Sequence, residues 1–134
     1  MKLFPALSAL LGLLALAACT PSSEVIGKRL YNDNCTACHG PTGQGDGPLS
    51  ADLKKQPSDL TLISQHNGGT FPLTRVLSTI DGYTRSQMGN TVMPEFGDEL
   101  QSGPKVLVDT GDGIETPTPA RLVALAEYLR SIQR

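Results

Sequence analysis

The chain has 134 residues, with 11 Lys and Arg against 13 Asp and Glu, which gives a formal net charge of −2. Nucleic-acid-binding proteins need clustered basic residues, so this balance argues against a nucleic-acid partner and against a polybasic membrane-binding surface. The length corresponds to one domain. Only 4% of the residues are aromatic and none is Trp, so large side chains to fill a core are few.

The first 18 residues predict a secretory signal. Lys2 gives a short positive start, and the apolar run 3–18 carries no charge and is shorter than the ~20 residues that span a bilayer. The run is followed directly by Cys19, and the letters L-A-A-C at this point resemble the lipobox of bacterial lipoproteins. There the cysteine receives a diacylglycerol and cleavage occurs before it. The alternatives are that Cys19 is incidental in an ordinary signal, or that the segment stays as an uncleaved anchor.

We therefore expect a lipoprotein signal peptide at 1–18, a lipidated tether at 19–23 and one domain at 24–134. Processing would leave this domain lipid-anchored on the periplasmic side of a bacterial membrane. Removal of Lys2 leaves 10 basic against 13 acidic residues, so the formal charge of the mature chain becomes 10 − 13 = −3.

A helix is predicted to begin near Glu24, with Ser22 or Ser23 as its N-cap, and to run into Cys35. Gly27 inside it costs about 1 kcal/mol relative to Ala, and such a glycine often allows another backbone to approach closely. Apolar residues at near-helical spacing predict one buried face, which is made of Val25, Ile26, Leu30 and Tyr31.

Residues 35–39 read C-T-A-C-H, the motif that attaches c-type haem. Cys35 and Cys38 on one helical turn can each reach one vinyl group of the same porphyrin, and His39 then lies under the ring with a nitrogen aimed at the iron. A thioredoxin-like pair would follow a strand, and a structural zinc site needs four Cys or His ligands. The chain has three Cys, two His and no second pair. The sequence therefore predicts one covalently bound haem c.

The nine residues after the motif (40–48) include four glycines and predict a loop. A phosphate-binding loop would need a preceding strand and a following G-K-[ST], and neither is present. Further on, residues 67–69 predict a turn. A short helix at 72–80, ended by Gly82, has an apolar stripe of Leu73, Val76, Leu77 and Ile80.

A long polar segment occupies 97–118, and segments of this length are often functional. Within it, 106–108 could form a short strand. The D-T-G-D-G run at 109–113 lacks the ligand spacing of an EF-hand calcium loop. Thr118 as N-cap and a proline at the first position predict a final helix at 119–133. Its apolar stripe is Leu122, Leu125, Leu129 and Ile132.

The haem motif, a later Met-Pro pair and the two terminal helices together resemble the class I c-type cytochromes of bacteria, here in lipoprotein form. In that family the first and last helices cross near a right angle, and the matching positions are Gly27, Tyr31, Leu125 and Tyr128. The resemblance implies a cytochrome c domain at 24–134. Its fold would be all-α, with three to four helices wrapped around one haem and long loops that could include a short β hairpin.

The resemblance also implies ligands and supporting groups. Met93 would be the sixth iron ligand, and Pro94 would stiffen its loop. Met88 and His66 are the alternatives. Ligation by Met and His gives a higher reduction potential than ligation by two His. A proline carbonyl would accept the hydrogen bond from the other nitrogen of the haem-ligand imidazole, and Pro48 matches that position best.

The implied function is single-haem electron transfer between a respiratory donor and an oxidase or reductase, without enzyme activity. The protein would be a monomer tethered through the lipid on Cys19. We expect no ring of lysines around the haem, because the chain is acidic, and partner contacts that are weak and small in area. The alternatives are a fixed haem-bearing subunit of a larger dehydrogenase or oxidase, and a ligand-binding or sensor haem protein with an open iron site.

Overall fold

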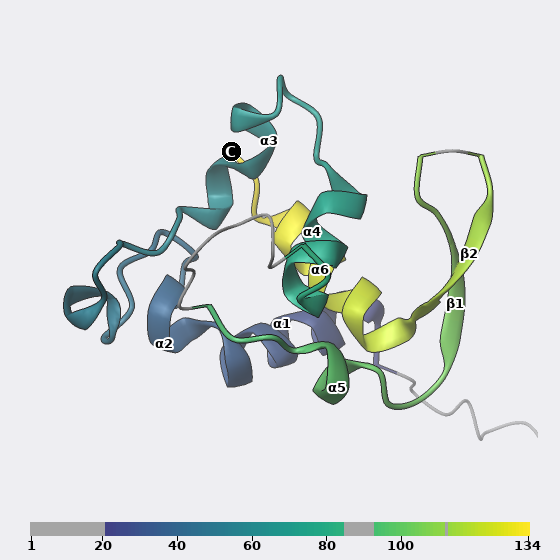
Figure 1. Ribbon diagram of the computed structural model, residues 1–134, viewed down its shortest axis with the longest axis horizontal. Coiled ribbons are helices and arrows are strands. Elements are labelled where there is room, and N and C mark those ends of the chain that lie inside the picture. Colours follow the sequence, from purple (N-terminus) through teal and green to yellow (C-terminus); the bar gives the residue numbers. More distant parts are fainter. Residues whose placement is uncertain (1–20, 85–92, 112) are drawn as a thin grey trace, which may run out of the picture.

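The computed structural model describes residues 21–84, 93–111 and 113–134. The predicted signal peptide, Cys19 and Met88 lie outside these ranges. Helices predominate, with one antiparallel pair of strands, which confirms the expected all-α class with a short hairpin (Figure 1). In chain order the elements are α1 (Ser23–Asn34), α2 (Thr36–His39), η1 (Ser50–Asp52), η2 (Leu60–Leu62), α3 (Ile63–His66), α4 (Leu73–Asp81), α5 (Gly97–Leu100), β1 (Lys105–Asp109), β2 (Glu115–Pro119) and α6 (Ala120–Ser131). Within the described ranges, no helix is long and apolar enough to cross a membrane.

The first helix begins as predicted. The side chain of Ser22, the N-cap of α1, accepts a hydrogen bond from the backbone N–H of Val25 at 3.4 Å. The predicted apolar face is only half right, because Val25 and Ile26 are 59% and 36% exposed. They lie in the first turn, before α1 meets another helix, while the later positions Leu30 and Tyr31 are buried.

Helices α1 and α6 pack directly against each other at a glycine. A Cβ added to Gly27 would overlap the carbonyl oxygen of Ala124 and would lie 2.8 Å from the Cβ of Tyr128. One turn further along α1, the rings of Tyr31 and Tyr128 are tilted against each other with centroids 5.3 Å apart. The contact that Gly27 permits therefore joins the first and the last of the described helices.

The rest of the core comes from α4, which packs on α6, and from α5, which packs on α4. Helix α4 agrees with the predicted apolar stripe, and Gly82 ends it with φ of +96°, in the left-handed region that favours glycine. The buried apolar residues that pack together as one core cluster are Leu30, Tyr31, Val76, Leu77, Ile80, Leu100, Leu122, Leu125, Ala126, Tyr128 and Leu129.

The hairpin β1–β2 corrects the predicted start of the last helix. Thr118 is not an N-cap, because it lies in β2 opposite Val106 and its hydroxyl donates to the carbonyl of Thr116 at 3.0 Å. Pro119 is the N-cap instead, and the helix ends at Ser131 rather than at 133. The hairpin extends away from the helices and leaves Leu107 60% exposed (Figure 1).

Candidate functional site

The two cysteines of the motif lie on a single turn of helix. Cys35 ends α1, where its backbone N–H donates to Tyr31 at 2.8 Å, and its own carbonyl accepts from Cys38 at 3.2 Å and from His39 at 2.9 Å. Both thiols are free and half-buried. This is the arrangement that two thioether bonds to one porphyrin require.

The imidazole of His39 is oriented by one hydrogen bond. Its Nδ1–H donates to the backbone carbonyl of Ser58 at 3.0 Å, and a carbonyl oxygen only accepts, so the proton is on Nδ1. Burial lowers the pKa of His39 below its usual range, and the bond to Ser58 opposes this shift. The neutral imidazole thus offers the lone pair of Nε2, which is the form that binds a metal.

The acceptor for His39 is therefore Ser58, and the prediction of Pro48 is wrong. Pro48 is exposed and belongs to a loop that follows the end of α2. In that loop Gly47 N–H donates to Cys38 O at 3.1 Å and Leu49 N–H donates to Ala37 O at 2.9 Å. The backbone of this loop thus donates hydrogen bonds to carbonyls at the C-terminal end of α2. The Nδ1 of His39 is instead bonded to Ser58, which lies in the segment after the loop.

Gly47 allows this loop to lie against α2. An added Cβ would lie 2.5 Å from the carbonyl oxygen of Ala37 and 2.6 Å from that of Thr36. Tyr31 secures the start of the loop, since its hydroxyl donates to the carbonyl of Gly40 at 2.6 Å. Burial raises the pKa of Tyr31 above its usual range, with Cys35, Tyr128 and Asp46 adding to the shift, so the hydroxyl keeps its proton.

Cys35 is partly buried against the apolar core. Burial raises the pKa of the free Cys35 thiol to about 12, and Cys38 and Glu99 of α5 add to the shift. Several apolar side chains pack against the core without being fully covered, as the lining of a haem crevice would be: Leu60, Ile63, Phe71, Leu73, Phe96, Val123 and Ile132. The site fits covalent haem, because it combines two thiols, a metal-binding imidazole and apolar groups that are not fully covered.

The sixth ligand stays a prediction. Met93 is half-buried in the segment that leads to α5, and the N–H of Phe96 ties that segment to the carbonyl of Ile80 at 3.1 Å. His66, one alternative, is exposed at the end of α3. Met88, the other alternative, lies outside the described residues.

Sequence reasoning missed Ser58 and the role of Gly47. The pattern Asp59-x-Thr61 does indicate a capped turn, and Asp59 indeed accepts from the N–H of Thr61 at 2.8 Å. Nothing local indicates that the carbonyl just before this cap faces an imidazole 19 positions earlier in the chain.

Comparison with models of known protein families found a match for this chain. The model of the family described as Cytochrome c matches residues 25–133, from the first turn of α1 to beyond the end of α6, with both strands included. The match covers every candidate haem-binding residue and begins after the predicted tether. No curated protein matches the chain significantly.

Proposed function

Because the chain belongs to the cytochrome c family, we propose that it is a single-haem electron carrier that faces the periplasm. The cofactor of the family is covalently attached haem c, typically one haem held through a C-x-x-C-H motif. One observation carries the proposal: the single turn of α2 brings together Cys35, Cys38 and a His39 whose Nδ1–H is already bound to Ser58.

In this proposal each site residue has one role. Cys35 and Cys38 would hold the haem through thioethers, and Nε2 of His39 and the sulfur of Met93 would bind its iron. When bound, the haem would supply one-electron Fe(III)/Fe(II) chemistry. With His39 and Met93 both bound to the iron, water would be kept from it, and little would rearrange when the electron moves. The His/Met pair gives a higher potential than two His would.

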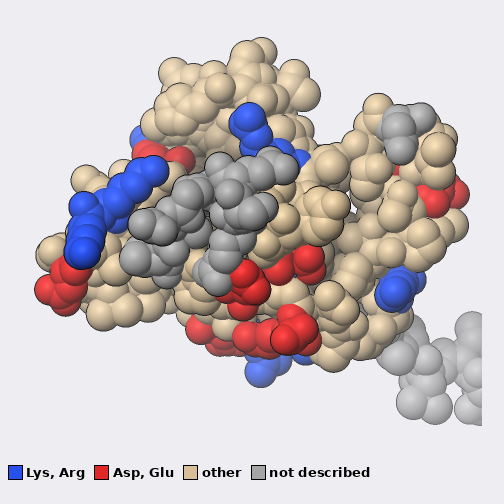
Figure 2. Space-filling view, viewed as in Figure 1, with Lys and Arg blue, Asp and Glu red and all other residues tan. Residues whose placement is uncertain are grey.

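The charge distribution supports weak docking to redox partners. In Figure 2 the carboxylates gather along the lower middle of the face, while Lys and Arg form one short strip at the left and separate spots elsewhere. On this face the described residues form no continuous basic band. We propose that a respiratory donor and an oxidase or reductase meet this protein through small contacts that are short-lived.

Removing Met93 tests the closed iron site. In the haem-loaded Met93→Ala protein we expect loss of the sulfur-to-iron charge-transfer band of the oxidised form and a lower midpoint potential, because a soft thioether that stabilises Fe(II) is gone. The reduced variant should also bind carbon monoxide, which the parent with both axial positions filled should not. The measurements are visible spectroscopy and a redox titration.

Met88→Ala and His66→Ala are the matched controls, since these residues are the competing ligands. Both variants should keep the band and the parent potential. Survival of the band in Met93→Ala, or its loss in Met88→Ala, would refute the assignment. Carbon monoxide binding by the parent would favour the open-site alternative.

We also propose that the protein is tethered by lipid on Cys19. Mass spectrometry of the mature amino terminus should find Cys19 as the first residue, carrying the diacylglycerol and an acylated amino group. Cys19→Ser should move the protein from the membrane fraction to the soluble fraction or leave its precursor uncleaved. A mature terminus without acylated Cys19 would contradict the tether.

A further inference from the structure

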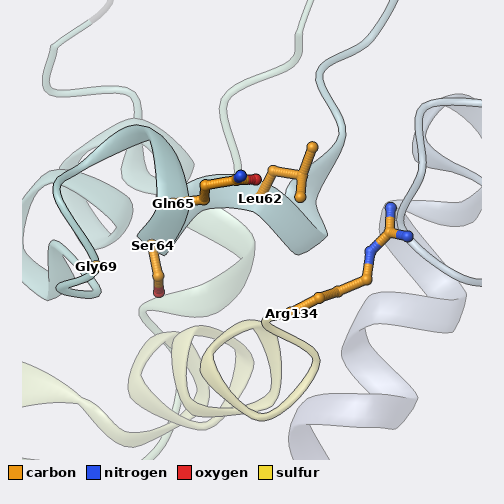
Figure 3. A pocket seen from close by; sticks show the side chains of 5 residues that line it. All are labelled: Leu62, Ser64, Gln65, Gly69 and Arg134. Atoms are coloured by element: carbon orange, nitrogen blue, oxygen red, sulfur yellow. The ribbon is translucent and has the colours of Figure 1, made fainter.

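The last two residues of the chain fold back onto the segment that follows Ser58. Arg134 makes three contacts there: its backbone N–H donates to Thr61 O at 3.1 Å, its Nε to Thr61 Oγ1 at 2.7 Å, and one terminal nitrogen pairs with an Asp59 carboxylate oxygen at 2.9 Å. In Figure 3 its side chain extends away from Ser64 and Gln65. A pocket of about 620 Å³ remains beside this contact, and none of Cys35, Cys38 and His39 lines it.

Gln133 holds the same segment one turn further on. Its side-chain oxygen accepts from the N–H of Ser64 at 2.8 Å, and its amide nitrogen donates to Leu60 O and Leu129 O, both at 2.7 Å. One amide thus joins α6 to both η2 and α3. These bonds connect residues 69 and 73 positions apart in the sequence.

Asp59 links the contacts made by Gln133 and Arg134 to Ser58. Its carboxylate is the N-cap of η2 and accepts from Thr61 N–H at 2.8 Å and from Thr61 Oγ1 at 2.5 Å. The bonds from Thr61 and the ion pair with Arg134 hold the pKa of Asp59 below its usual range. The Ser58 carbonyl belongs to the peptide group that leads into Asp59, so the orientation of Asp59 decides where that oxygen points.

The loop at residues 40–48 contacts the other side of the segment around Ser58. Leu60 N–H donates to Gly43 O at 2.6 Å, and an added Cβ on Gly45 would overlap the carbonyl of Pro57. Ser58 therefore lies between two supports. The loop support comes from residues next to the haem motif, and the other comes from the end of the chain.

We propose that Gln133 and Arg134 are positioning residues for the haem ligand. By fixing Asp59 and η2 they keep the Ser58 carbonyl within hydrogen-bond distance of His39 Nδ1. This inference rests on the proposed function, in which Nε2 of His39 binds iron. A firm Nδ1–H bond makes the imidazole a stronger donor, which favours Fe(III) and lowers the reduction potential. Loosening the C-terminal contact should raise the potential.

The test uses the full haem-loaded protein and the variants Arg134→Ala and Gln133→Ala. We expect each to shift the Fe(III)/Fe(II) equilibrium about threefold toward Fe(II), which is roughly 30 mV at about 59 mV per tenfold change. The Nδ1 proton of His39, followed by NMR in the reduced protein, should exchange with solvent faster. Arg134→Lys keeps a cation for Asp59 and should recover at least about half of the shift. Asp59→Asn should act like Arg134→Ala.

Glu127→Gln is the matched control. It removes the exposed ion pair between Glu127 and Arg130 in α6, which is 3.0 Å long, and leaves the contacts with η2 in place. It should leave both the potential and the proton exchange unchanged. A parent-like potential and parent-like exchange in Arg134→Ala and Gln133→Ala, with haem still attached, would overturn the proposal even if stability fell. Failure of the proposed function would show itself differently, as a parent protein without covalent haem or without His39 on the iron.

Discussion

Replacing Gly27 by valine is expected to lower the free energy of unfolding by about 3 kcal/mol or more. The added Cβ would overlap the backbone carbonyl of Ala124, so no side-chain rotation can relieve the clash. The helices α1 and α6 would have to separate, which would also pull apart the rings of Tyr31 and Tyr128 that pack at 5.3 Å. Denaturant unfolding followed by circular dichroism measures the loss.

Lys28→Ala is the control for this experiment. Lys28 is the next residue of α1 and is exposed, and Ala is a good helix former, so the change should stay within about 0.5 kcal/mol. Gly27→Ala should already be destabilising, although a glycine inside an ordinary helix would gain about 1 kcal/mol from this substitution. A stabilised Gly27→Ala protein would show that the helices do not approach each other at this glycine.

Replacing Gly47 by valine is expected to cost about 2–3 kcal/mol and to reduce the fraction of protein that carries covalent haem. The φ of Gly47 is not positive, so steric overlap with α2 alone accounts for the cost. Moving the loop away would break the hydrogen bond from Gly47 to Cys38 O and would expose the end of the helix that bears both thiols. Thermal unfolding measures the first effect, and haem staining of the denatured polypeptide measures the second.

Gln44→Ala tests whether any change in this loop has the same result. Gln44 is exposed and only reaches the Thr42 hydroxyl at 3.2 Å, so its removal should leave stability within about 0.5 kcal/mol and haem content unchanged. Equal losses in Gly47→Val and Gln44→Ala would mean that the contact of Gly47 with α2 is not the cause.

Much of the fold could be predicted because its signals are local. Helix α4 follows from one apolar stripe and the stop at Gly82, and the start of α1 follows from Ser22 as N-cap. The strand at 106–108 was expected, and β1 confirms it. Thr118 was assigned wrongly because a hydroxyl before a proline is also typical of an N-cap, and only the ladder with Val106 places it in a strand.

The candidate site could likewise be predicted only where its geometry is local. The motif at 35–39 is contained in one helical turn, so the approach of its two thiols and imidazole needs only local geometry. The support of the imidazole is not local. Ser58 is 19 positions from His39, and Arg134 is 75 positions from Asp59. Such pairings depend on how whole segments pack, so the spacing of residues in the sequence does not predict them.

By itself the sequence determined that this chain carries haem chemistry, because two cysteines and a histidine on one turn are sufficient to specify covalent attachment. It also indicated Gly27 as a position where another backbone could approach closely. The tertiary structure alone decided which backbone at that contact excludes a Cβ, and which carbonyl receives the Nδ1 proton of His39. The physical reason is that a carbonyl oxygen is present in every residue, so its selection as a partner depends on position in space and not on residue type.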